Sequence, residues 1–395
     1  MRLTARNLSV LLLLTGNSYS ALASSNSGKD KKRPSPGCSK SNQNSTSPSL
    51  ASLPEPLKPG TERNFTLPPP TSATPSGDSR AVAGVGRPYT LFVPDEYDAA
   101  EPAPLIVSLH GAGRTARWQA ELDGLAPHEG GNDDDVSSAY SLQVPGFNDG
   151  RHLVVYPQST GTTSDDMFWE GYPGLAAGID DVGYVLAVLD AVGRDACIDE
   201  ARVYAVGKSQ GGGLVNVLAC DADGRVDGRF AALASVSGAY YVPGVTPENC
   251  RPDAVEIPGC GGGGQNKNNA KGGITPFLAF HGGNDTTIAY AGGERRGYCL
   301  PSIQHWVDEW VRREGLHEEP LEVRNLTGEA TAYVYGDGEG SGSDGVFTFV
   351  YDGDRVGHDW PATFGNTDNE EHGTGPASFN ASSLIMDFFR NYSLS

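Results

Sequence analysis

The sequence predicts an α/β fold in which a mostly parallel β-sheet is covered by helices on both faces. Short apolar runs alternate along the chain with segments whose apolar residues recur at helical spacing, which is typical of parallel strands joined by crossover helices. Some runs, such as residues 104–109, are apolar almost throughout, as expected of strands buried on both faces. Glycine-rich turns follow several runs, at the sheet edge where such folds carry their functional groups.

The strands and helices follow from these patterns in chain order. Strands are expected at residues 89–93, 104–109, 152–157, 203–206, 230–236, 274–281 and 346–351. Helices are expected at residues 180–192, 214–220, 304–313 and 381–389. Asp180 and Asp181 resemble a paired-carboxylate site, but their position at the start of a helical pattern favours helix capping.

The chain divides into three parts by composition. Residues 1–23 read as a signal peptide, because two arginines precede a short apolar stretch and a small-x-small cleavage pattern. Residues 24–80 are rich in Ser, Pro and Asn and are expected to be a disordered segment or linker. Residues 81–395 are expected to form one catalytic domain, with long polar insertions at 129–149 and 260–273. No separate carbohydrate-binding module is recognisable.

Charge and cysteine content narrow the class of protein. The net charge is −20, and the part beyond Arg87 holds 18 basic and 45 acidic residues, which argues against nucleic acid or an anionic membrane as a partner. Six cysteines without a C-x-x-C pair favour disulfides in an extracellular protein over a metal site. Their pairing stays open, although Cys197 and Cys220 flank one strand–helix unit and are expected to pair. Several N-x-S/T sequons suit a secreted glycoprotein.

The segment V-Y-A-V-G-K-S-Q-G-G-G, residues 203–213, carries the most specific motif. It is a G-x-S-x-G nucleophile elbow in its proper setting, because a strand precedes it and a helix follows. The elbow predicts that Ser209 is a nucleophile held in a strained turn. Lys208, within the motif, is expected to be solvated.

Three further motifs stand at strand ends in the order that an α/β-hydrolase requires. The L-H-G-A-G turn predicts an oxyanion hole formed by the backbone N–H groups of Ala112 and Gln210, with His110 in a structural role. H-G-G-N-D supplies Asp285 as the acid that orients a histidine. G-H-D-W-P supplies His358 as the general base, and His372 is the alternative.

The expected chemistry is ester hydrolysis through an acyl-enzyme, with no metal and no organic cofactor. Two tryptophans near these motifs have two possible roles. Trp169 and Trp360 are expected to form walls of a substrate pocket, or alternatively to pack in the core.

The combined motifs, together with V-V-Y-P-Q-S-T-G at 154–161 and I-D-D-V-G-Y-V at 179–185, resemble the secreted fungal feruloyl esterase family, which is related to extracellular polyhydroxybutyrate depolymerases. The resemblance implies hydrolysis of feruloyl esters of plant cell-wall polysaccharide, with Ser209, Asp285 and His358 as the triad. Gly37-Cys38 also resembles the mature N-terminus of some members, which implies that Cys38 is in a disulfide and that part of the N-terminal segment is ordered.

Other functions remain open from sequence. An acetyl xylan esterase or a polyester depolymerase would use the same motifs on another ester. A serine peptidase of this fold and a noncatalytic carbohydrate-binding relative are further alternatives. The long polar insertions are where such substrate preferences would be built.

Overall fold

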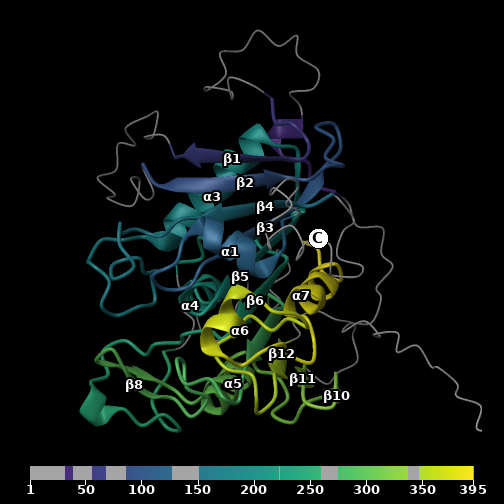
Figure 1. Ribbon diagram of the computed structural model, residues 1–395. Helices are drawn as coiled ribbons and strands as arrows, with labels where there is room; N and C mark the ends of the chain where they lie inside the picture. Colours follow the sequence, from purple (N-terminus) through teal and green to yellow (C-terminus); the bar gives the residue numbers. More distant parts are fainter. Residues whose placement is uncertain are drawn as a thin grey trace, which may run out of the picture.

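The computed structural model describes residues 32–38, 56–67, 86–126, 151–221, 223–258, 275–336 and 347–394. Within them, ten strands form one sheet in the order β1-β2-β4-β3-β5-β6-β7-β12-β11-β10 (Figure 1). The strands from β4 to β12 run parallel, and antiparallel strands extend the sheet on both sides. The strand bounds, in sheet order, are Thr61–Thr66, Pro88–Val93, Leu153–Pro157, Ala103–Leu109, Ile198–Lys208, Ala232–Val236, Phe277–His281, Phe347–Tyr351, Thr331–Tyr335 and Glu322–Asn325.

Helices cover both faces of this sheet. One face packs against α3, α4 and α5, and the other against α1 and α7, so that each face has its own hydrophobic core. A short helix, α6, follows β12 and precedes α7 in the sequence. The bounds are α1 Ala116–Asp123, α3 Asp181–Asp195, α4 Gln210–Ala219, α5 Ile303–Arg313, α6 Thr367–His372 and α7 Ala381–Phe389. The predicted fold class, an α/β-hydrolase with a mostly parallel sheet, is confirmed.

The strands and helices predicted from sequence are present close to their expected positions. The central strands β3, β4, β6 and β7 are almost entirely buried, which accounts for their continuous apolar runs. Asp180 caps α3, as expected, because its side chain accepts the N–H of Gly183. Asp181 is instead buried and paired with Arg87 at 2.6 Å. The insertions at 129–149 and 260–273 lie outside the described residues.

Two pieces of the predicted linker belong to the folded body. Residues 61–66 form β1, which pairs with β2 in antiparallel register, and Phe65 stacks on Tyr89. Residues 32–38 lie against the start of β5, where the Ser35 N–H donates to the Ile198 carbonyl oxygen at 2.9 Å. The polar composition of residues 24–80 gave no sign of either contact, because an edge strand such as β1 needs few apolar side chains and residues 32–38 are held by backbone hydrogen bonds and a disulfide.

The disulfides differ from the expected pairing. Cys197 pairs with Cys38, not with Cys220, so the geometric argument from the strand–helix unit was wrong. The N-terminal segment lies against the start of β5, so Cys38 is next to Cys197, where Cys220 at the end of α4 was expected. The disulfide for Cys38 that the resemblance implied is present. A second disulfide joins Cys250 to Cys299.

A small antiparallel hairpin projects beside the main sheet. It consists of β8, Gly293–Arg295, and β9, Tyr298–Leu300 (Figure 1). The Cys250–Cys299 disulfide ties its second strand to the preceding loop. No helix within the described residues is long and apolar enough to cross a membrane.

Candidate active site

Ser209 occupies the sharp turn between β5 and α4. Its backbone has φ 54° and ψ −114°, a conformation that costs energy for a residue with a Cβ and that marks functional positions. Gly207 and Gly211 allow the turn, because a Cβ on Gly207 would lie 2.3 Å from the Gly211 backbone. A Cβ on Gly211 would lie 2.2 Å from the Leu109 carbonyl oxygen. The local sequence therefore permits the strained serine because glycine stands two residues before it and two residues after it.

Asp285 and His358 meet at the ends of two neighbouring parallel strands. Asp285 follows β7, His358 follows β12, and Nδ1 of His358 lies 2.8 Å from Oδ2 of Asp285. The other carboxylate oxygen accepts the backbone N–H groups of Thr287 and Ile288 at 2.9 and 2.7 Å. Because the carboxylate accepts Nδ1–H, Nε2 of His358 is the nitrogen left to accept a proton.

The environment sets the charge of this pair. Burial alone would raise the pKa of Asp285, but the charge and hydrogen bonds of His358 and His281 hold that pKa well below its usual range. Burial and the charge of Lys208 lower the pKa of His358, and the carboxylate of Asp285 opposes them. An ionised carboxylate beside a neutral imidazole is the state that a general base requires at neutral pH.

Ser209 and His358 line the same cavity, which has a volume of about 160 Å³. Their side chains are both buried, with small exposed fractions of 8% and 7%. No hydrogen bond from Ser209 Oγ is present among the described residues. Such contacts are often long without substrate and tighten in the substrate complex.

The loop after β3 approaches Ser209 from the other side. A Cβ on Gly111 would lie 3.4 Å from the Ser209 Cβ, which is ordinary van der Waals contact, so this loop lies directly against the serine. Ala112 lines the cavity, and Gln210 begins α4, where the first N–H groups of a helix have no partner within it. The sequence-predicted oxyanion donors thus lie on the two segments that adjoin the serine.

His110 holds this loop in place and does not reach the cavity. Its ring is fully buried, Nδ1 lies 2.7 Å from the Gly111 carbonyl oxygen, and Nε2 accepts the Ser159 N–H at 3.1 Å. Burial lowers the pKa of His110 to about 4, so the ring is neutral and Nδ1 is the donor. The structural role expected for His110 agrees with these contacts.

The two tryptophans assigned to a pocket wall require correction. Trp169 is fully buried and donates its Nε1–H to the His110 carbonyl oxygen at 2.8 Å. Trp360 is buried in the core, and its Nε1–H donates to Ser382 at 2.8 Å. Neither lines the cavity beside Ser209. Both indole N–H groups donate to acceptors in the protein interior, so the two tryptophans pack in the core and do not form a pocket wall.

Lys208 was expected to be solvated, and this is wrong. Its ammonium group is buried, lies 2.8 Å from the Asp368 carboxylate and donates to the His358 carbonyl oxygen at 3.0 Å. Lys208 therefore connects the nucleophile elbow to the loop after β12 that carries His358, called the histidine loop below, and to α6. The sequence pattern gave no signal for this, because Asp368 lies 160 residues away in a polar stretch.

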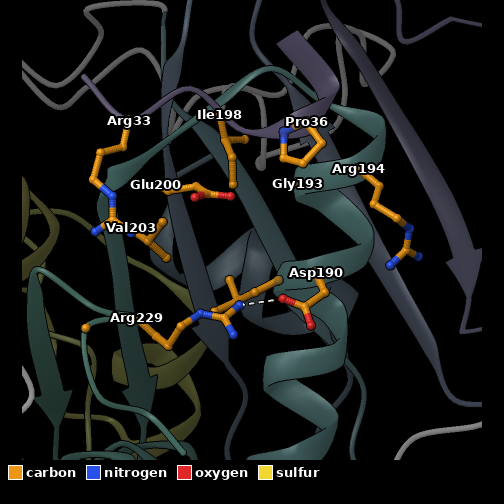
Figure 2. A pocket seen from close by; sticks show the side chains of 11 residues that line it. Arg33, Pro36, Asp190, Gly193, Arg194, Ile198, Glu200, Val203 and Arg229 are labelled. Carbon is orange, nitrogen blue, oxygen red and sulfur yellow. Dashed lines mark hydrogen bonds and ion pairs between the residues drawn. The ribbon is translucent and has the colours of Figure 1, made fainter. Parts of the chain in front are cut away.

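A larger cavity of about 460 Å³ lies at the opposite end of β5. Figure 2 shows that its lining comes from the N-terminal segment, α3 and β5, with an ion pair between Arg229 and Asp190. It contains no nucleophile–base pair, so its size does not make it the reaction site. Within the described residues, no group of three or more His, Cys, Asp or Glu side chains is arranged to hold a metal ion.

Comparisons with known proteins agree with the motifs. The chain is 29% identical over 212 residues to "Probable feruloyl esterase C" of Aspergillus niger, an alignment that covers 53% of this chain and 58% of the relative. It is 26% identical over 274 residues to "Feruloyl esterase D" of Neurospora crassa, covering 69% and 75%. The chain thus spans less than two thirds of the length of the type C relatives.

Among solved structures, an acetyl xylan esterase from Aspergillus awamori aligns over 80% of this chain and 100% of its own, with 17% identity and a TM-score of 0.43. No protein-family model matches the chain. The resemblance predicted from the motifs is confirmed by the sequence alignments: the chain is related to the feruloyl esterases of types C and D.

Proposed function

We propose that the chain is a secreted serine esterase that hydrolyses feruloyl esters of plant cell-wall polysaccharide such as arabinoxylan. The observation that carries this proposal is the strained Ser209, which shares one cavity with the buried His358–Asp285 pair. The named relatives support the feruloyl ester as the substrate. Oxidised cysteines support secretion, and residues 1–23 would then be a signal peptide.

In the proposed reaction, Nε2 of His358 takes the proton of Ser209 Oγ, which attacks the ester carbonyl carbon. The N–H groups of Gln210 and Ala112 bind the oxyanion that forms, and one such donor typically contributes a factor of about 100 to 1,000 in rate. His358 then passes its proton to the leaving carbohydrate oxygen.

The second half repeats these steps with water. His358 takes a proton from water as the oxygen attacks the acyl-enzyme carbonyl. The bond to Ser209 Oγ breaks, the serine recovers the proton from His358, and ferulic acid leaves. The chain's own residues supply every proton transfer, so the proposed mechanism uses no cofactor.

The test is a substrate panel on the purified protein, with Ser209→Ala as the matched variant. We expect hydrolysis of methyl ferulate, and a loss of at least about 1,000-fold in kcat with Ser209→Ala. Cleavage of 4-nitrophenyl acetate but not of methyl ferulate would point instead to an acetyl esterase. Depolymerisation of polyhydroxybutyrate would point to a polyester depolymerase. Undiminished hydrolysis by Ser209→Ala would overturn the mechanism.

A further inference from the structure

The cavity beside Ser209 has an unusual charge for this protein. The whole chain carries a net charge of −20, yet four cationic side chains and a single carboxylate, that of Asp368, line this cavity. The cations are Arg114, Lys208, Arg295 and Arg296. A cationic pocket in an acidic protein attracts an anionic group to one place on its surface.

Two of the four cations already have carboxylate partners. Lys208 is paired with Asp368 at 2.8 Å, and Arg114 with Glu371 at 2.5 Å. Arg295 and Arg296 form no ion pair with any of the described residues. Arg295 faces the Tyr241 hydroxyl, a neutral partner, and Arg296 lies over the Phe168 ring, 5.4 Å from its centroid.

The backbone that presents these arginines is constrained. They end β8 and begin its turn, where Arg296 has φ 54° and Gly297 has φ 84°. Two consecutive left-handed residues form the tight turn typical of a two-residue hairpin, in which Asn or Gly is the usual first residue. A long cationic side chain kept at a strained position beside the reaction cavity indicates a role for that side chain.

We propose that Arg295 and Arg296 bind a carboxylate carried by the carbohydrate half of the substrate, so that the preferred ester is attached to a uronic acid or lies next to one. This inference rests on the proposed feruloyl esterase function. A feruloyl group has only a phenol as an ionisable group, which is neutral near pH 7, so the anion must come from the carbohydrate. Guanidinium groups suit it because they donate paired hydrogen bonds to a carboxylate.

The experiment compares two esters that differ in one group: feruloyl esters at O2 of methyl galactopyranosiduronate and of methyl galactopyranoside. We expect kcat/KM to be about 10-fold higher for the uronate at low salt, since one charge-assisted contact is typically of this size. The preference should shrink as ionic strength rises, because part of the hairpin is exposed.

The double variant Arg295→Gln/Arg296→Gln should reduce the ratio of the two kcat/KM values to about one. The matched control, Arg312→Gln/Arg390→Gln, removes the same charge from exposed positions away from the cavity and should keep the wild-type ratio. Equal kcat/KM for both esters in the wild type, or a ratio unchanged in the Arg295→Gln/Arg296→Gln variant, would overturn the inference.

These outcomes are separable from failure of the proposed function. If the neutral ester is hydrolysed in a Ser209-dependent way without a uronate preference, the esterase proposal stands and the arginine site is refuted. If neither of these esters nor methyl ferulate is hydrolysed, the esterase proposal fails. Calorimetric titration of methyl galactopyranosiduronate and methyl galactopyranoside into the Ser209→Ala variant then still tests the arginines, with tighter binding of the uronoside expected.

Discussion

Two histidine–carboxylate pairs lie close together near Ser209, and only one has the geometry of a general base. His358 pairs with the buried Asp285, whereas His372 pairs with Asp359 at 2.6 Å, and the two rings are 6.1 Å apart. Chain order after Asp285 left both histidines as candidates. The sequence favoured His358 because it directly follows a strand, and this is the feature that brings it beside Asp285. The sequence did not indicate that His372 pairs with Asp359 or Lys208 with Asp368, because both pairs depend on how the polar segment after β12 folds.

The pH dependence should report the protonation of His358. Burial and Lys208 lower its pKa below the usual 6.5, and the neutral form is the one that accepts a proton. We therefore expect kcat/KM to be constant at neutral pH and to fall tenfold per pH unit once the pH drops below a midpoint lower than 6.5. Initial rates on methyl ferulate between pH 4 and 8 measure this. A midpoint above 7 would contradict the assigned environment.

At the scale of elements, the site depends on the junction of β5, the histidine loop and α6. Lys208 at the end of β5 contacts both Asp368 in α6 and the His358 backbone. Sequence patterns predicted β2 to β7, β12 and the helices α3, α4, α5 and α7, because elements that are largely buried carry long or periodic apolar runs. They missed α6, whose sequence T-D-N-E-E-H has no apolar stripe and which is held by the Asn366 capping box. They also missed α1, the hairpin strands β8 and β9, and the strands β1, β10 and β11 at the two edges of the sheet.

This junction predicts opposite pH shifts for two variants. Lys208→Met removes a cation that lowers the pKa of His358 and leaves the Asp368 charge that raises it, so the acidic midpoint should move to higher pH. Asp368→Asn leaves the cation unopposed, so the midpoint should move to lower pH. Each variant breaks a buried ion pair, which typically costs about 3–5 kcal/mol. Urea unfolding measures the cost, and pH–rate profiles of the folded variants measure the shifts. Shifts in the same direction would contradict this account.

At the scale of the whole molecule, the body begins earlier than composition indicates. The segment that contains Cys38 packs so closely on the start of β5 that a Cβ on Gly37 would lie 2.1 Å from the Ala196 carbonyl oxygen. Composition could not reveal this, because the segment is fixed by backbone hydrogen bonds and one disulfide rather than by apolar side chains. The Gly-Cys resemblance was the one signal that pointed to it.

Removing this disulfide should destabilise the protein globally. The Cys38–Cys197 bond closes a span of 159 residues, and loss of a native disulfide typically costs about 2–5 kcal/mol. We expect Cys38→Ser/Cys197→Ser to lower the urea midpoint. Cys250→Ser/Cys299→Ser, which opens a span of 49 residues, is the comparison and should lower it less, because the entropy of a closed loop grows with its length. Equal midpoints in the wild type and the Cys38→Ser/Cys197→Ser variant would refute this.

The Cys38–Cys197 disulfide would also hold the N-terminal segment on the body of the protein if the backbone between them were cut. A single cut between residues 67 and 86 would leave the N-terminal fragment joined to the body by Cys38–Cys197 and by the pairing of β1 with β2. The cut protein would migrate as one species on a non-reducing gel and as two after reduction. A protease that cuts once in this stretch would therefore not release the fragment, and Ser209 and its cavity, at the other end of β5, would remain assembled.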